Sequence, residues 1–128
     1  MIVGLGIDVA SISRIAESLE RFGDRFWERI LTPGEREDLA QRADRATALA
    51  GRFAAKEALS KALGGPKDVW WQSVEIRKGP LGMPQLNLYG PALPHLARLG
   101  VSRSHVSITH DADVAAAVVI LESDPSAR

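Results

Sequence analysis

Residues 46–66 read ATALAGRFAAKEALSKALGGP. Alanine and leucine favour helix, and the Gly64-Gly65-Pro66 run is a strong stop signal, so we expect a long helix from about Ala46 to Leu63. Five alanines recur at intervals of four residues along this helix: Ala46, Ala50, Ala54, Ala58 and Ala62. Side chains spaced in this way share one face, so they form a smooth ridge against which another element can pack closely.

The N-terminal residues Ile2–Val9 alternate in the way that is typical of a strand. One face carries only apolar side chains: Val3, Leu5, Ile7 and Val9. The other face carries Gly4, Gly6 and Asp8, so a ligand or another backbone can approach the carboxylate without obstruction. Asp8 therefore either marks a site or caps the helix that follows.

Shorter elements follow on both sides of the long helix. An apolar stripe predicts a helix over 12–22 with Ser11 or Ser13 as its N-cap, and Thr32-Pro33-Gly34-Glu35 predicts a capping box. Glu35 is then a structural residue. The later part predicts a hairpin of strands 69–78 and 85–89, a short helix ending at Gly100, and strands around 105–109 and 114–121. We expect one domain over 1–122 and a disordered tail over 123–128.

Composition excludes several classes of protein. The 128 residues hold 16 Lys and Arg against 16 Asp and Glu, which argues against nucleic acid as a partner. There is no cysteine, so a disulfide framework and thiolate metal sites are excluded, and a reducing cytoplasm fits. The N-terminus lacks a basic leader, and the longest apolar run, Val114–Leu121, is too short to span a membrane. We expect a soluble, cytoplasmic protein.

Charged residues gather on the long helix. Glu57 and Lys61 lie four residues apart and share a stripe with Phe53, a spacing that an exposed ion pair also has. Three cations, Arg52, Lys56 and Lys61, surround this single carboxylate. Such an excess of positive charge suits a polyphosphate held together with a metal ion.

Asp8 and Glu57 are the candidate metal ligands. Carboxylates, water and phosphate oxygens form a hard coordination set that favours Mg²⁺ over zinc. The two residues are 49 positions apart in the chain, so spacing alone does not predict that they meet. A second polar cluster, Ser107 to Asp111, lies at the end of a predicted strand. It is either a site or an ordinary polar strand end with a satisfied His110.

Four blocks of the sequence resemble the bacterial holo-[acyl-carrier-protein] synthases, the short class of 4′-phosphopantetheinyl transferases. They are Gly4–Asp8 with Arg14, Arg29–Thr32 with Glu35, Gly51–Gly64, and His105–His110, and the tip motif Gly82-Met83-Pro84 also fits. The similarity spans nearly the whole chain except the tail. The sequence departs from the common family pattern at Gly65-Pro66-Lys67 and at Trp70-Trp71.

The resemblance implies an α+β fold in which an antiparallel-type sheet packs with a long helix and shorter helices. It also implies a homotrimer with coenzyme A bound between neighbouring subunits. The implied activity is transfer of the 4′-phosphopantetheine arm of coenzyme A to a serine of apo acyl carrier protein, within fatty acid and other lipid biosynthesis. The implied products are holo carrier and adenosine 3′,5′-bisphosphate.

The resemblance also assigns roles to residues. Asp8 and Glu57 bind Mg²⁺, and Lys61 binds the phosphates of coenzyme A. The base that accepts the serine proton stays open between Glu57, Asp111 and His110. The resemblance places further residues near the nucleotide half of coenzyme A, with the hairpin tip given by the adjacent subunit: Arg52, Ser60, Gly82, Pro84 and His110. Lys56 either joins them in binding coenzyme A or only solvates the helix.

Acyl carrier proteins are acidic, so Arg14, Arg21 and Arg25 are expected to form the carrier docking patch, although they could equally be a solvated basic face. Two alternatives to the main interpretation stay open. One is the same reaction with a carrier domain of a polyketide or peptide synthase as acceptor. The other is a non-catalytic trimeric protein that binds coenzyme A.

Overall fold

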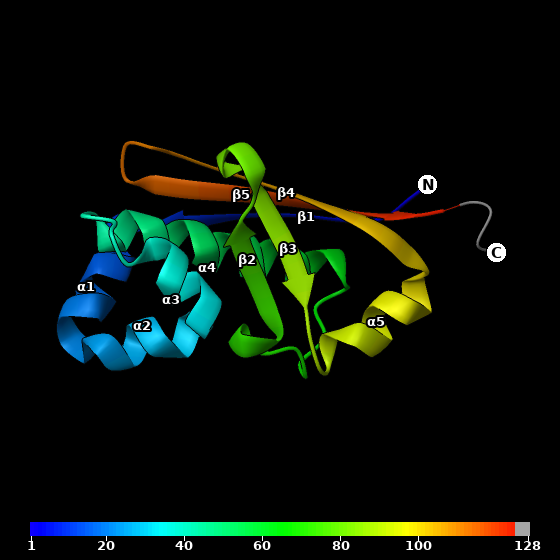
Figure 1. Cartoon of the computed structure of the whole chain (residues 1–128), viewed down its shortest axis with the longest axis horizontal. Helices are drawn as coiled ribbons and strands as arrows, with labels where there is room; N and C mark the ends of the chain where they lie inside the picture. Colours follow the sequence, from blue (N-terminus) through cyan, green and yellow to red (C-terminus); the bar gives the residue numbers. More distant parts are fainter. Residues whose placement is uncertain (125–128) are drawn as a thin grey trace.

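A three-stranded antiparallel sheet lies across one long helix in the computed structural model, which describes residues 1–124 (Figure 1). The strands run in the order β1-β5-β4, with bounds Ile2–Ser11, Val114–Ser123 and Val101–Asp111. The helix is α4, Arg45–Ala62. The α+β fold class is therefore confirmed, and the long helix has nearly the predicted bounds.

The glycine face of β1 packs directly against the backbone of α4. A Cβ atom added to Gly6 would lie 1.8 Å from the carbonyl oxygen of Ala58, and one added to Gly4 would lie 2.4 Å from that of Ala62. Only glycine permits this approach. The alanine ridge of α4 therefore packs against the glycine face of β1. Asp8, on the same face of β1, is brought beside this helix.

The apolar face of β1 points away from the helix. Leu5, Ile7 and Val9 are each more than 60% exposed. They lie beside Ile120, Val118 and Ala116, which are their partners on β5 and are only partly buried. We call these six residues the open sheet face. Exposed apolar side chains that lie side by side mark a surface that contacts another protein, a membrane or a ligand.

The other elements surround α4. Helices α1 (Ile12–Phe22), α2 (Asp24–Ile30) and α3 (Pro33–Leu39) gather near its N-terminal half, and the hairpin of β2 (Val74–Lys78) and β3 (Pro84–Leu88) lies beside them (Figure 1). Helix α5 (Ala92–Leu99) leads into β4. No helix within residues 1–124 is both long and apolar enough to cross a membrane.

Several strands are longer than predicted, and two predicted boundaries differ in a way that affects the fold. The strand predicted from residue 69 begins at Val74, because Trp71–Ser73 form a 3-10 turn instead. This turn is held by tertiary contacts: Trp71 stacks on Phe53, and the Gln72 amide donates to backbone carbonyls of α2 and Leu31. The predicted tail begins too early, since Ser123 ends β5 and is buried. Residues 125–128 of that tail lie outside the described residues.

A buried polar network joins α3 to α4. The Lys56 ammonium donates to Glu35 Oε1 at 2.6 Å and to the backbone oxygens of Ile30 and Trp71 at 2.6 and 2.9 Å. The Glu35 carboxylate also accepts from the backbone N–H groups of Thr32 and Ile76. The capping box at Thr32 is confirmed, and Glu35 is structural. Because every group is paired, this buried ion pair avoids the large cost of an uncompensated charge.

Replacing Gly6 with alanine tests the contact between β1 and α4. The added Cβ would overlap the Ala58 carbonyl, so one element must move, and we expect a loss of stability of about 4 kcal/mol or more. Chemical denaturation measures it. The control is Glu37→Ala at an exposed position on α3, which should change stability by less than about 0.5 kcal/mol. An unchanged unfolding midpoint for Gly6→Ala would contradict the close packing.

Candidate active site

Asp8, Glu57 and Lys61 form one cluster where β1 crosses α4. Lys61 Nζ donates to Asp8 Oδ1 at 3.1 Å and to the backbone oxygen of Ile7 at 3.0 Å. Asp8 reaches this position because Gly4 and Gly6 let β1 approach the helix, and Glu57 lies one turn before Lys61 on the same stripe of α4. Residues far apart in the sequence are thus brought together.

Glu57 is in an environment that disfavours its negative charge. Its pKa is raised, first by partial burial and second by the nearby carboxylate of Asp8, whereas Lys61 lowers it. Two carboxylates that repel each other in this way are held more easily when a cation lies between them. Lys61 supplies one positive charge, and its side chain is half exposed, so it can also turn to an incoming anion.

The donor set fits a magnesium ion that is shared with a phosphorylated substrate. No group of three or more acidic, histidine or cysteine side chains within residues 1–124 could hold a metal alone. Magnesium usually takes only one or two carboxylates and completes its octahedral shell with water and phosphate oxygens. Asp8 and Glu57 match that requirement in type and in number.

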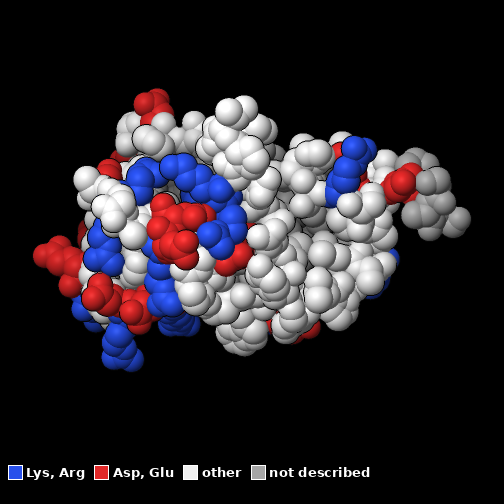
Figure 2. Space-filling model, in the orientation of Figure 1, with Lys and Arg blue, Asp and Glu red and all other residues white. Residues whose placement is uncertain are grey.

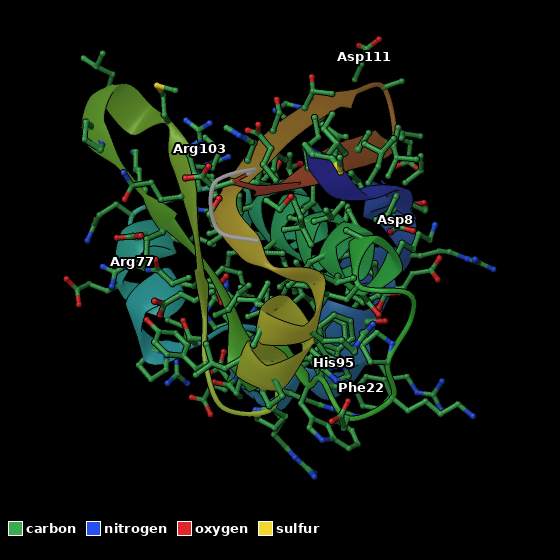
Figure 3. All side chains as sticks on the ribbon, turned by 90° about the vertical axis from the view of Figure 1, so that its right-hand side faces the viewer. Asp8, Phe22, Arg77, His95, Arg103 and Asp111 are labelled. Carbon is green, nitrogen blue, oxygen red and sulfur yellow. The ribbon has the colours of Figure 1, made fainter. Side chains whose placement is uncertain are left out.

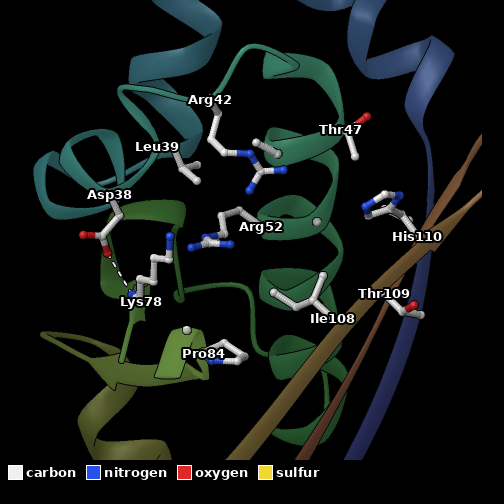
Figure 4. Close-up of a pocket in the computed structure, with 14 residues that line it drawn as sticks. Asp38, Leu39, Arg42, Thr47, Arg52, Lys78, Pro84, Ile108, Thr109 and His110 are labelled. Carbon is white, nitrogen blue, oxygen red and sulfur yellow. Dashed lines mark hydrogen bonds between the residues drawn. The ribbon is translucent and has the colours of Figure 1, made fainter. Parts of the chain in front are cut away.

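A second group of predicted residues lines a cavity on the other side of α4. This cavity has a volume of about 230 Å³. Arg52, Gly82, Pro84 and His110, which were all predicted to lie near the nucleotide, contribute to its walls. Figure 4 shows Arg42, Arg52 and Lys78 pointing towards one another from three different elements. The cavity is therefore rich in cationic donors.

Arg52 is poised to bind an anion. It is mostly buried, which lowers the pKa of its guanidinium, although an arginine in protein still keeps its charge. Its Nε is buried without a hydrogen-bond partner within the described part of the chain. A buried donor without a partner is costly, and an anionic ligand would remove that cost. An anionic group bound in this cavity could supply the missing acceptor.

Arg42 and Lys78 were missed by the sequence reasoning. Arg42 lies just after α3, and Lys78 ends β2, with its backbone N–H donating to Asp38 Oδ2 at 2.8 Å (Figure 4). Neither belongs to a recognisable motif. The one available signal was that Lys78 directly precedes the hairpin tip that contains Gly82 and Pro84.

The two groups do not form one site within a single chain. Arg52 and Glu57 are five residues apart on α4, which turns their side chains to different sides of the helix. Asp111 ends β4 at the tip of the β4–β5 hairpin, and its side chain projects away from the rest of the molecule (Figure 3). Its strand is separated from β1 by β5. Its role as a base stays a prediction.

The remaining predicted residues fall in two places. Ser60 and Glu57 line a further cavity with Trp70 and Trp71. Lys56 also lines that cavity, but the residue is only 3% exposed. Its ammonium already has three protein acceptors. Direct binding of coenzyme A by this ammonium would therefore require the buried network to break.

The predicted docking residues are exposed at the helical end of the molecule. Arg14 and Arg21 belong to α1, and Arg25 belongs to α2. The Arg21 guanidinium lies over the Phe22 ring, 5.2 Å from its centre. Figure 2 shows charged side chains gathered over α1–α3, while the surface over β2, β3 and α5 is largely uncharged. On this face, acidic and basic side chains are concentrated at the end of the molecule formed by the helices that carry Arg14, Arg21 and Arg25.

Comparison with known proteins shows similarity over nearly the whole chain. A sequence model described as the 4′-phosphopantetheinyl transferase superfamily matches residues 4–119. A holo-[acyl-carrier-protein] synthase of Nitratidesulfovibrio vulgaris is 51% identical and aligns over 96% of this chain and 100% of its own length.

Solved structures of holo-[acyl-carrier-protein] synthases have the same fold as this chain. The holo-[acyl-carrier-protein] synthase of Neisseria meningitidis superposes with a TM-score of 0.85 at 38% identity, covering 96% of this chain and 100% of that one. The Helicobacter pylori protein of the same name, in complex with coenzyme A, gives a TM-score of 0.80 at 34% identity, covering 92% and 99%.

Proposed function

The chain belongs to the 4′-phosphopantetheinyl transferase superfamily, and we propose that Asp8, Glu57 and Lys61 carry out the transfer chemistry. Its function is to transfer the 4′-phosphopantetheine arm of coenzyme A to a serine of apo acyl carrier protein. The observation that carries the residue assignment is the cluster of two carboxylates and one lysine where β1 crosses α4. A protein that only bound coenzyme A would not need this arrangement.

The reaction is a displacement at the β-phosphorus of coenzyme A. The serine oxygen forms a bond to this phosphorus, and the bond to the bridging pyrophosphate oxygen breaks, so adenosine 3′,5′-bisphosphate leaves. Charge builds on the leaving oxygen as this happens. Lys61 is half exposed beside Asp8, so its ammonium can contact the pyrophosphate and stabilise that charge.

We propose that the Glu57 carboxylate accepts the proton of the attacking serine hydroxyl. This carboxylate lies in the same cluster as the phosphate-binding lysine, where the proposed displacement takes place. Asp111 and His110 are the alternatives. Both lie on β4, which β5 separates from β1.

Magnesium is the proposed metal, with Asp8 and Glu57 as its protein ligands. When bound, it would supply positive charge to the pyrophosphate oxygens. Asp8 is held for this role by the glycine face of β1, and Glu57 by the rigid helix. Removing divalent ions should therefore abolish transfer, and adding Mg²⁺ back should restore it.

A homotrimer with sites between subunits is the proposed assembly. The open sheet face leaves Leu5, Ile7 and Val9 in water, and a second copy would cover it. In addition, the cationic cavity around Arg52 lies on a different side of α4 from Glu57. A neighbouring subunit would supply this cavity to the nucleotide half of coenzyme A. One complete site would then need two chains.

The acidic carrier is proposed to dock on Arg14, Arg21 and Arg25. Replacing Arg14 and Arg21 together with glutamate should raise KM for the carrier at least about tenfold at low salt, because it reverses the local field that steers association. The KM for coenzyme A should stay unchanged. Arg98→Glu on α5 is the control for a general change of charge. Equal effects on both substrates would contradict a docking role.

Release of adenosine 3′,5′-bisphosphate tests the proposal. The purified chain is incubated with coenzyme A, Mg²⁺ and an apo acyl carrier protein, and the nucleotide products are separated by chromatography. We expect release that requires the carrier and stops with EDTA. Coenzyme A binding without release, for several acidic carriers, would support the non-catalytic alternative.

A chain without cysteine needs no oxidising compartment to fold, and the cytoplasm is its proposed location, with fatty acid biosynthesis as its pathway.

A further inference from the structure

The tip of the β4–β5 hairpin is hydrogen-bonded to the first turn of α1, and both lie at the same end of the molecule (Figure 1). The residues that connect the two strands are Ala112 and Asp113. The Asp113 carboxylate accepts from the Ser13 N–H at 2.9 Å through Oδ1 and from the Ser13 hydroxyl at 2.7 Å through Oδ2. The Asp113 backbone oxygen accepts from the Ile12 N–H at 2.9 Å. One hairpin residue therefore holds the first two residues of this helix.

Ser11 completes the contact. It is the N-cap of α1, and its hydroxyl accepts from the Arg14 N–H at 3.2 Å and donates to Asp113 Oδ2 at 3.4 Å. The first N–H groups of a helix have no partner within the helix. Here the N–H groups of Ile12, Ser13 and Arg14 all have acceptors, and Asp113 supplies two of them.

Asp113 also supplies a negative charge that α1 lacks at this end. The first turn of α1 contains no acidic residue, although negative charge is favourable near the N-terminus of a helix. Arg14 adds a positive charge to that turn. A carboxylate from another element, 100 residues away from Ser13 in the chain, thus compensates an unfavourable arrangement of charge.

The turn that carries Asp113 has a strained backbone. Ala112 has a φ of 51°, in the left-handed region that residues with a side chain rarely adopt. Such a conformation persists where surrounding contacts determine it. The bonds of Asp113 to α1 are contacts of this kind, so the hairpin tip and the helix are fitted to each other.

This contact lies between two parts of the proposed reaction. Asp8, a proposed metal ligand, is on β1, which continues into α1 at Ser11. Arg14 and Arg21, which are proposed to bind the carrier, are on α1. The direction in which α1 leaves β1 therefore determines where a docked carrier lies relative to the metal site. Displacement of reacting groups by about 1 Å can cost a large factor in rate.

We propose that Asp113 is a positioning residue for the acyl carrier protein. By fixing the first turn of α1 to the β4–β5 hairpin, it holds Arg14 and Arg21 where the carrier contacts them, and it needs no contact with coenzyme A. This inference rests on the proposed docking of the carrier on α1. It goes beyond that proposal because it adds a residue from a distant part of the chain.

Calorimetric binding of apo acyl carrier protein at low salt tests this proposal without turnover. Asp113→Ala removes the carboxylate bonds and should weaken carrier binding about fivefold, within the range of coupling found in one hydrogen-bond network. Charge alone predicts the opposite, because losing a carboxylate makes this end more attractive to an acidic carrier. Binding of coenzyme A should stay unchanged. Glu37→Ala, at an exposed position on α3, should leave both affinities unchanged.

Asp113→Asn separates the contact from the charge. Its amide oxygen can accept from the Ser13 N–H, and its amide nitrogen can donate to the Ser13 hydroxyl, so the helix stays fixed while the charge is lost. We expect this variant to bind the carrier at least as tightly as the unchanged chain. Ser13→Ala removes one bond from the helix side and should weaken carrier binding about twofold, which provides a second variant should Asp113→Ala not fold.

The same change in a chain that carries Arg14→Ala and Arg21→Ala tests whether Asp113 acts through these arginines. Asp113→Ala should then weaken carrier binding by less than about twofold, because residues that act together are not additive. A full fivefold loss in this background would overturn the proposal. Equal weakening of carrier and coenzyme A binding would also overturn it, since that pattern indicates general loss of structure.

Unchanged carrier binding in folded Asp113→Ala and Ser13→Ala would likewise overturn the positioning role. Failure of the proposed function has a different signature. In that case the unchanged chain would release no adenosine 3′,5′-bisphosphate in the transfer assay, while the effects of Asp113 on carrier binding would still follow the predicted pattern.

Discussion

Glu57→Gln should lower kcat/KM for phosphopantetheine transfer by at least about a hundredfold, the usual size of effect when a group that stabilises transition-state charge is lost. The amide keeps the shape of the side chain but removes the negative charge that the proposed metal and the serine proton both require. The amide also removes a partly buried charge and its repulsion from Asp8, the two effects that raise the pKa of Glu57. Stability should therefore stay the same or rise slightly.

The control for this variant is Glu37→Gln, which makes the same change at an exposed position on α3. It should leave the rate unchanged. Initial rates at several concentrations of coenzyme A and of carrier separate kcat from KM. Full activity of Glu57→Gln in a folded protein would contradict both roles assigned to this residue.

Two inactive variants should restore activity when their subunits are mixed. Arg52→Ala damages the proposed nucleotide half of the site, and Lys61→Ala damages the phosphate half. Each variant alone leaves every site in a homotrimer defective. In a mixed trimer, one site pairs the intact half of each chain, so an equal mixture should reach about a quarter of wild-type activity.

Subunits are exchanged by denaturing and refolding the two variants together. The control is a chain that carries both Arg52→Ala and Lys61→Ala. Refolding each variant separately before mixing gives the background. If the mixture were no more active than the background, although hetero-oligomers had formed, both halves of the site would come from one chain.

The contact between β1 and α4 could be predicted in part. Two glycines beside Asp8 indicate a face that admits a backbone, and the alanine ridge indicates a helix that can be approached closely. Local periodicity carries such information. It does not say which partner fills the hollow face, so the meeting of Asp8 with Glu57 required the resemblance and became visible only in three dimensions.

The burial of Lys56 could not be predicted from its local sequence. Beside Arg52 and Lys61 it has the same appearance in the sequence, that of a cation on a helix next to a carboxylate. Its position in the core is set by Glu35, 21 residues earlier, and by carbonyl groups of two other elements. Burial of a charge depends on tertiary partners, which helical spacing cannot reveal.

The turn at Trp71–Ser73 has a similar explanation. Valine and tryptophan favour strands, so a strand from residue 69 was a reasonable expectation. Stacking on Phe53 and the hydrogen bonds of Gln72 hold the chain in a tight turn instead. The deviation places Trp71 in the wall of the cavity beside Glu57, which the sequence did not indicate.

The most direct test of the central claim is the intact mass of an apo acyl carrier protein after incubation with this chain, coenzyme A and Mg²⁺. We predict a gain of one phosphopantetheine group, which is absent with EDTA, with Glu57→Gln, and with a carrier whose acceptor serine is replaced by alanine. An unchanged carrier mass, in the presence of folded protein that binds coenzyme A, would contradict the account.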